Sequence, residues 1–159
     1  MEVKYAKRMM TEGGSEISDI LALTAKPEVI SFAGGLPAPE LFPVEDMERM
    51  ANEVLEEVGR VALQYSSAQG FPKFRQQIAD RMNDKQKTNV KADDILISSG
   101  SQQALEFSAK IFIDEGDVIL CESPTYLGAL NAFNGYGPKY IEVETDEDGM
   151  NMEALERVL

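Results

Sequence analysis

The stretch that decides the fold is ILISSGSQQALEFSAKIFIDEGDVILCESPTYLGAL, residues 95–130. Its apolar beginning, 95–98, predicts a short buried strand, and helical spacing of apolar residues over 102–113 predicts a helix after a glycine turn. A second apolar run at 118–121 predicts another strand, and 124–133 predicts the helix that follows it. Apolar strands that alternate with helices are typical of a parallel sheet with both faces covered.

The sequence on the carboxyl side continues this alternation. Residues 139–144 predict a third strand, and the acidic stretch 146–149 predicts the turn that closes it. Asn151 is placed to cap a last helix over 151–159. The predicted fold class is therefore α/β, with three or more mainly parallel strands, flanking helices and right-handed crossovers. Because only three strands are visible, we expect an incomplete sheet.

On the amino side, two longer helices precede the deciding stretch. Apolar residues recur at helical spacing over 44–58, and Gly59 predicts a left-handed stop. The next helix is predicted from Pro72, since proline is favoured in a first helical turn. A short helix is predicted near 15–25, whereas 30–43 is dense in glycine and proline and is expected to be irregular.

Composition excludes several kinds of chemistry. The chain has 159 residues, the length of about one domain, and no histidine, which removes imidazole nucleophile activation, acid/base catalysis and metal ligation. The one cysteine, Cys121, permits no internal disulfide and no cysteine-rich zinc site. Since Cys121 lies in an apolar run, we interpret it as an inert core thiol rather than a reactive one. No metal site is predicted.

Charge indicates which partners to expect. With 15 basic and 28 acidic residues, the net charge is −13, which argues against binding to nucleic acid or anionic membranes. The sequence contains no apolar stretch of membrane-spanning length, and its start lacks the apolar core of a signal peptide. These features predict an acidic cytoplasmic protein.

Two places in the deciding stretch could carry chemistry. Gly100 allows a tight turn, and a helix that begins at Ser101 and Gln102 would present N–H groups to an anion such as a phosphate. The alternative is a serine-capped helix without a ligand, and both interpretations stay open. Tyr126, after the next strand, could stack on a flat heteroaromatic ligand or pack on the start of its own helix.

Five motifs in this order carry a resemblance. They are ISFAGGLPAPELFP (30–43), ALQYSSAQGFPKFR (62–75), ISSGSQQALE (97–106), GDVILCESPTYLGAL (116–130) and DEDGMNMEAL (146–155). Together they resemble the amino-terminal part of a fold-type I aminotransferase of class I/II, which uses pyridoxal 5′-phosphate (PLP). The subgroup includes 2-aminoadipate and kynurenine aminotransferases and the effector domains of MocR-like regulators.

The resemblance implies roles for individual residues. The turn at Gly100 with Ser101 and Gln102 would bind the PLP phosphate, and Tyr126 would stack on the pyridine ring. Tyr65, in the QYS motif, would reach the cofactor of the neighbouring subunit of a homodimer.

The resemblance also implies the domain organisation and the substrates. Gly35 and Leu36 in the AGGLP loop would face the substrate. Residues 1–43 would form an amino-terminal arm and substrate loop, and residues 44–159 would form the amino-terminal part of the PLP-binding large domain. The enzyme would move an amino group between an amino acid and a 2-oxo acid in two half-reactions.

The family's Schiff-base lysine has no counterpart here. In the family this lysine follows a serine, and none of the lysines of this chain does so: 4, 7, 26, 73, 85, 87, 91, 110 and 139. The partner of the pyridinium nitrogen and the carboxylate-binding arginine also come later in the family's sequences. We therefore assign no catalytic residue, expect the chain to be inactive alone, and favour truncation of a longer enzyme over a short gene product.

Two alternatives remain at this point. The first is the PLP-sensing domain of a MocR-type transcription regulator, although only about 30 residues precede the first motif and the charge opposes DNA. The second is a small nucleotide-binding α/β domain that uses Gly100–Gln102 for a different phosphate, which would leave the AGGLP and PTY motifs without roles.

Overall fold

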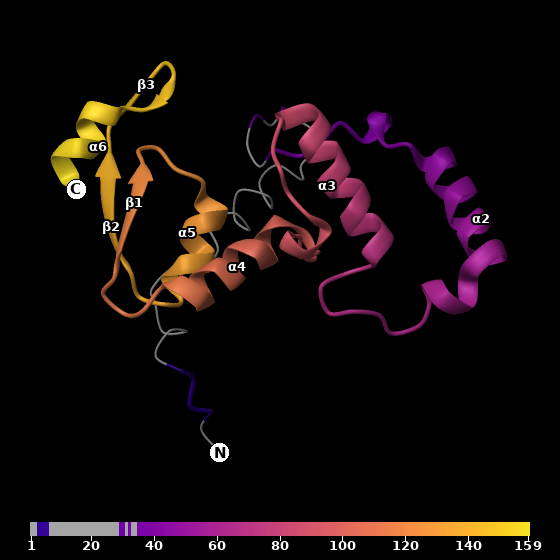
Figure 1. The fold of residues 1–159 in the computed structure, drawn as a ribbon. Helices are drawn as coiled ribbons and strands as arrows, with labels where there is room; N and C mark the ends of the chain where they lie inside the picture. Colours follow the sequence, from indigo (N-terminus) through magenta and orange to yellow (C-terminus); the bar gives the residue numbers. More distant parts are fainter. Residues whose placement is uncertain (1–2, 7–28, 31, 33–34) are drawn as a thin grey trace. The chain divides into compact units, whose positions relative to one another are not determined.

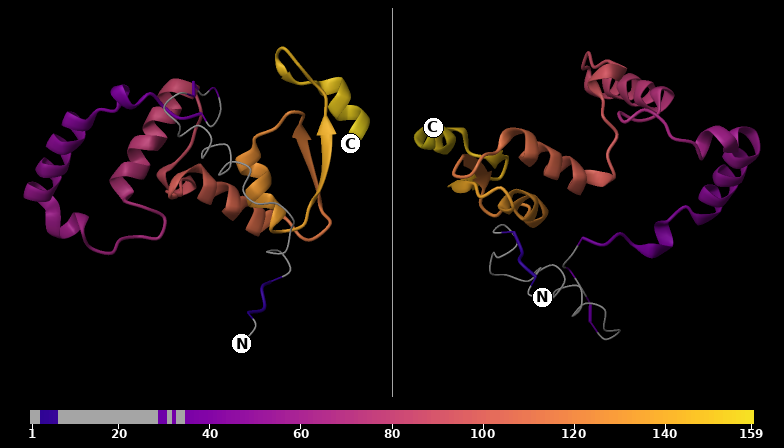
Figure 2. Two further views of the ribbon diagram at one scale, coloured as in Figure 1. Left: turned by 180° about the vertical axis from the view of Figure 1, so that it is seen from behind. Right: turned by 90° about the horizontal axis from the view of Figure 1, so that it is seen from below.

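The computed structural model describes residues 3–6, 29–30, 32 and 35–159 (Figures 1 and 2). The described residues divide into two compact units, one with residues 3–6 and 69–159 and the other with residues 29–30, 32 and 35–68. The helix predicted near 15–25 lies outside the described residues.

The secondary structure of the described residues alternates between helices and short strands. In chain order the elements are η2 (Pro39–Leu41), α2 (Val44–Ala62), α3 (Pro72–Gln86), η3 (Ala92–Asp94), α4 (Gly100–Phe112), β1 (Val118–Glu122), α5 (Leu127–Asn134), β2 (Lys139–Val143), β3 (Thr145–Asp146), β4 (Gly149–Met150) and α6 (Met152–Val158).

The strands β1 and β2 form a parallel pair, seen as two arrows that point the same way in Figure 1. Their register runs from Val118 opposite Lys139 to Glu122 opposite Val143, and α5 lies between them in the chain. This confirms the predicted strand–helix–strand unit. The predicted acidic turn is the tip of a small antiparallel hairpin, β3–β4.

The predicted strand at 95–98 is wrong, because this segment belongs to neither sheet of the described chain. Ile95 has extended backbone angles, yet the N–H of Ile97 donates to the carbonyl of Gln69 at 3.0 Å. An apolar run favours burial, yet Leu96 is 55% exposed here, and a strand also needs a neighbouring strand to form a ladder. The parallel sheet of the described residues therefore has two strands instead of three or more.

The predicted helix boundaries need two corrections. Helix α2 runs past 58 to Ala62, and the predicted stop is a kink at Val58 (φ −136°, ψ 20°), while Gly59 is not left-handed. Helix α5 begins at Leu127 rather than at Pro124, because Tyr126 before it is extended. The sequence signals at Gly59 and Pro124 lie within a few residues of the two features. They predicted a stop where α2 has a kink, and a start of α5 that is three residues too early.

The core of the described residues consists of small apolar side chains. The fully buried apolar residues are Ala79, Ala109, Ala132, Val143 and Ala154. They come from α3, α4, α5, β2 and α6, and α4 packs on α5 while α6 packs on β2. Small residues allow backbones to approach closely, which positions the helix starts described below. No helix of the described residues is long and apolar enough to cross a membrane.

Candidate functional site

The start of α4 has backbone N–H groups that make no hydrogen bond to other described residues. Gly100, Ser101 and Gln102 are the first residues of α4, and their N–H groups have no carbonyl four positions back within the helix. The preceding Ser99 makes no side-chain capping bond to them. Because the helix dipole adds positive character at this end, the start of α4 is suited to an anion.

Two hydrogen bonds shape the turn into α4. The hydroxyl of Ser98 donates to the carbonyl of Gly100 at 3.1 Å, and the N–H of Ser99 donates to Oε1 of Gln103 at 2.6 Å. Gly100 has φ +82°, which disfavours other residues, and among the described residues no atom beyond its chain neighbours and the nearby backbone of its own helix lies within 4 Å of the position a Cβ would take. The turn is fixed, yet it is open beside Gly100.

A side-chain bond joins the start of α4 to the start of α5. Nε2 of Gln102 donates to the carbonyl of Gly128 at 3.2 Å. One N–H of the Gln102 side-chain amide is therefore engaged within the protein, which leaves its second N–H and the backbone N–H of Gln102 for an anion.

Tyr126 lies at the start of α5, and its ring packs on Gly128. A Cβ on Gly128 would lie 2.6–2.7 Å from Cζ, Cε1 and the hydroxyl oxygen of Tyr126. The ring thus packs on its own helix, as the second interpretation expected, but the residue stays 64% exposed. The structure brings Ser101, Gln102 and Tyr126 onto two helix starts that Gln102 and Gly128 connect.

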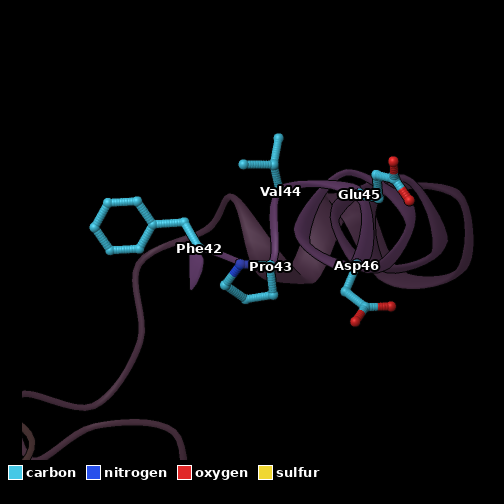
Figure 3. Close-up of a pocket in the computed structure, with 5 residues that line it drawn as sticks. All are labelled: Phe42, Pro43, Val44, Glu45 and Asp46. Carbon is cyan, nitrogen blue, oxygen red and sulfur yellow. The ribbon is translucent and has the colours of Figure 1, made fainter. Parts of the chain in front are cut away.

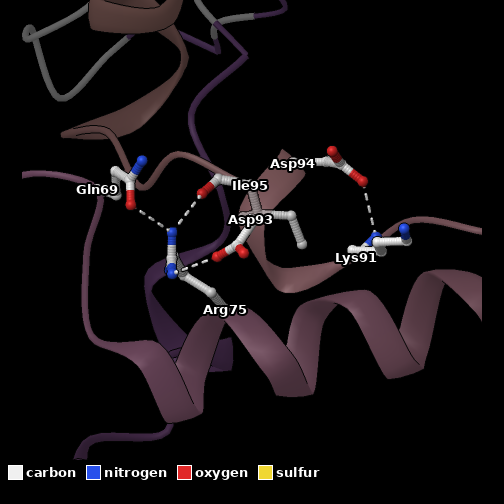
Figure 4. Close-up of polar contacts among 6 residues, drawn as sticks. All are labelled: Gln69, Arg75, Lys91, Asp93, Asp94 and Ile95. Atoms are coloured by element: carbon white, nitrogen blue, oxygen red, sulfur yellow. Dashed lines mark hydrogen bonds and ion pairs between the residues drawn. The ribbon is translucent and has the colours of Figure 1, made fainter.

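Arg75, which the sequence analysis missed, organises the segment that leads into α4 (Figure 4). This residue of α3 is only 6% exposed, and its guanidinium donates to Oε1 of Gln69 (2.9 Å), Oδ1 of Asp93 (3.3 Å) and the carbonyl of Ile95 (3.5 Å). Among the described residues its Nε atom has no acceptor. An arginine one position after Phe74 in the amphipathic pattern was the signal that could have revealed it.

A glycine contact reinforces this connection. Gly70 has φ +106°, and a Cβ there would overlap with Cγ1 and Cβ of Ile97. Only glycine fits this close approach. Arg75 and Gly70 together hold the chain before α3 against the segment that becomes α4, so the α4 start has a defined position within its unit.

Three predicted residues belong to the other unit. The side chain of Tyr65 is fully exposed, and its N–H donates to Oε1 of Gln64 at 2.8 Å. Gly35 has φ +61°, and Leu36 is 71% exposed. Their predicted roles, across a dimer and toward a substrate, stay predictions.

Lys110 lies in the last turn of α4 and is exposed. Ten residues separate it from Gly100, which places it about 15 Å along the helix axis. This position places Lys110 as an exposed charge at the negative end of the helix dipole, far from the start of α4.

Other candidate sites are weaker. A hollow lined by Phe42, Pro43, Val44, Glu45 and Asp46 lies at the start of α2, but Figure 3 shows the carboxylates of Glu45 and Asp46 pointing in different directions. In the described ranges no three acidic or cysteine side chains gather into a group that could hold a metal ion.

Two weakly acidic groups lie on the parallel strands. Partial burial, with Glu142 as a second cause, raises the pKa of the Cys121 thiol, and burial also raises the pKa of Tyr140. Since the thiolate is the reactive form, a raised pKa makes Cys121 less reactive. This fits the interpretation of an inert thiol, although Cys121 is half-buried rather than in the core.

Comparisons with known proteins identify the family. The family model described as "Aminotransferase class I and II" matches residues 29–159. An aromatic-amino-acid aminotransferase 1 from Thermococcus litoralis is 42% identical over 99% of this chain, and a 2-aminoadipate transaminase from Thermus thermophilus is 45% identical over 91%. The chain spans 38% and 35% of the lengths of these two relatives.

A solved structure agrees with this result. The kynurenine aminotransferase of Pyrococcus horikoshii, solved with PMP and with kynurenine as substrate, superposes with a TM-score of 0.88 at 38% identity. The match covers 98% of this chain and 38% of that enzyme. The fold described above is therefore an aminotransferase fold, and the chain belongs to the class I and II aminotransferase family.

Proposed function

We propose that these 159 residues are the amino-terminal part of a PLP-dependent aminotransferase that moves an amino group between an amino acid and a 2-oxo acid. The observation that carries the proposal is the open start of α4, with the exposed ring of Tyr126 on the connected start of α5. The family match over residues 29–159 supports it.

The phosphate of PLP fits the start of α4. A dianion would accept hydrogen bonds from the N–H groups of Gly100, Ser101 and Gln102 and from the Ser101 hydroxyl, at the positive end of the helix. The open space beside Gly100 supports this arrangement, because nothing in the described residues occupies the position of a Cβ there. The side chain of Gln102 holds α5 through one N–H to Gly128, while its backbone N–H and its second side-chain N–H are available to the anion.

The ring of Tyr126 supplies the stacking surface. Its contact with Gly128 supports the ring on one side, and its 64% exposure leaves surface for a flat heteroaromatic ring. When bound, PLP supplies the electron sink that weakens bonds at the amino acid Cα. The role of this chain's residues is to bind the phosphate, orient the pyridine ring and hold both in a fixed relation.

The remaining assignments are part of the same proposal. Residues 44–159 form an incomplete PLP-binding large domain, and residues 1–43 form the arm and the substrate loop, with Gly35 and Leu36 facing the substrate. Tyr65 reaches the cofactor of a second subunit in a cytoplasmic homodimer, which its full exposure permits. Neither nucleic acid nor a membrane is a partner, in keeping with the net charge of −13.

The chain alone lacks a lysine in the family's motif, and we propose that it does not transaminate. The open reading frame that contains these residues, called the full-length protein below, is expected to continue beyond Leu159 to a Ser-Lys motif. Turnover of amino acids with 2-oxoglutarate by the purified 159-residue chain would overturn this part of the proposal.

The experiment that tests the proposed function is an amino-transfer assay of the full-length protein. With PLP and 2-oxoglutarate, we expect glutamate formation from aromatic or 2-aminoadipate donors. PLP binding without turnover, together with a basic DNA-binding segment at the amino terminus of the full-length protein, would favour the regulator instead. Binding of ATP rather than PLP would favour the nucleotide-binding domain.

A further inference from the structure

Gly128 makes two contacts that the sequence analysis did not anticipate. It is a buried residue in the first turn of α5, and its carbonyl accepts the hydrogen bond from the side chain of Gln102 at 3.2 Å. The nearest atoms to its missing Cβ are Cζ, Cε1 and the hydroxyl oxygen of Tyr126. Gly128 therefore contacts both Gln102 at the start of α4 and Tyr126 at the start of α5.

The ring contact requires the absence of a side chain. A methyl group on Gly128 would lie 2.6–2.7 Å from the three atoms of Tyr126, whereas carbon atoms in contact lie about 3.5–4.0 Å apart. Because Tyr126 is largely exposed, its ring can move away, so the chain would tolerate the methyl group by displacing the ring by about 1 Å. Backbone conformation does not require glycine here, since Gly128 has no positive φ.

We propose that Gly128 is a positioning residue for the PLP ring: its bare Cα seats Tyr126, and its carbonyl holds the start of α5 against Gln102. This inference rests on the proposed function, because it assumes that the Tyr126 ring stacks on PLP. Gly128 does not touch PLP itself and acts through the two neighbouring side chains.

The test is a Gly128→Ala substitution in the full-length protein, with PLP affinity as the readout. We expect the Kd for PLP to rise about tenfold, since stacking on an aromatic side chain contributes about that factor to binding. The visible circular dichroism of bound PLP should change as well, because the ring above it has moved. Alanine is the better helix former, so a loss cannot come from a weaker helix.

Gly135→Ala is the matched control. Gly135 lies at the other end of α5 with an ordinary φ of −62°, and among the described residues no atom beyond its two chain neighbours lies within 4 Å of its Cβ position. This variant should bind PLP with wild-type affinity and give an unchanged spectrum.

A double-mutant cycle separates positioning from general damage. If Gly128→Ala acts by displacing the ring, then adding it to Tyr126→Ala should cause no further loss of PLP affinity. The same background removes the clash, so the double variant keeps the test valid even where Gly128→Ala alone folds poorly.

Each outcome has a distinct meaning. Wild-type PLP affinity in Gly128→Ala, or losses that multiply in the cycle, would overturn the positioning role while the proposed function stands. A full-length wild-type protein that binds no PLP would instead overturn the proposed function.

Discussion

Two helix starts in the same unit are built in opposite ways. At the start of α6, the side chain of Asn151 accepts a hydrogen bond from the N–H of Ala154 at 2.9 Å, so the helix is capped from within. At the start of α4, Ser99 makes no such bond, although serine is among the best capping residues. The comparison teaches that a capping residue in the sequence does not ensure a cap, and that an uncapped start remains available to a ligand.

The surroundings of the two starts explain the difference. Asn151 is also held by a bond from its side-chain amide to Asp146 at 3.0 Å, within the hairpin that precedes α6. At α4, in contrast, the N–H of Ser99 donates to Oε1 of Gln103, and the hydroxyl of Ser98 donates to the carbonyl of Gly100. The polar groups around α4 therefore fix the turn and leave its N–H groups open.

The largest effect should come from placing a negative charge at the open start. Ser101→Asp in the full-length protein is expected to weaken PLP binding about 100-fold, because a carboxylate beside the bound phosphate repels it. The same charge favours the helix dipole, so thermal stability should stay equal or rise. Titration of PLP by absorbance and a melting curve measure the two quantities.

Ser108→Asp provides the control on the same helix. Ser108 is exposed and lies seven residues beyond Ser101, about 10 Å along the axis, which is about one Debye length at moderate salt. Its PLP affinity should remain near that of the wild type. Equal losses in both variants would mean that overall charge, not the α4 start, controls binding.

The next effect concerns Arg75, whose hydrogen bonds hold the segment that leads into α4. Arg75→Met should lower the free energy of unfolding by about 2 kcal/mol, because it leaves the partly buried acceptors on Gln69 and Ile95 without their donor. Asp93→Asn should change it by less than about 0.5 kcal/mol, since the Asp93 side chain is 91% exposed. Urea unfolding of the full-length protein provides both values, and similar losses in the two would contradict the assigned role of Arg75.

The capped start provides a smaller effect. Asn151→Ala should destabilise the protein by about 1 kcal/mol, the usual cost of losing an N-cap, whereas Ser99→Ala should cost less because Ser99 caps nothing. Chemical denaturation of both variants measures the difference. A larger cost for Ser99→Ala would reverse the comparison between the two helices.

The smallest effect concerns Cys121 in β1, one of the two parallel strands that lie between α4 and α6 in the chain. The raised pKa of Cys121 means that the folded state holds the thiol proton more tightly than the unfolded state. The unfolding free energy should therefore fall as the pH rises above the ordinary thiol pKa of about 8.5. Cys121→Ala should flatten this slope between pH 8 and 10, and an unchanged slope would assign it to other groups such as Tyr140.

The sequence predicted the alternation of elements well, because helical spacing and apolar runs are patterns that a short stretch of chain carries by itself. The parallel pair, α4, and the Asn151 cap all follow from patterns within a few residues. The strand expected at 95–98 failed because strand formation depends on a neighbouring strand, which an apolar run cannot reveal.

The candidate site could be predicted only in part. Gly100, Ser101, Gln102 and Tyr126 were found from the turn, the helix start and the position after a strand. The Gln102–Gly128 bond and the Arg75 contacts join residues that are 26 and up to 20 positions apart, and no local pattern encodes such pairs. Side-chain contacts of this kind depend on tertiary packing.

The most direct measurement is a crystal structure of the full-length protein with PLP bound. We expect phosphate oxygens about 2.7–3.0 Å from the N–H nitrogens of Ser101 and Gln102, with the pyridine ring against Tyr126. A phosphate bound elsewhere, with water at the start of α4 and the Tyr126 ring away from the cofactor, would contradict it.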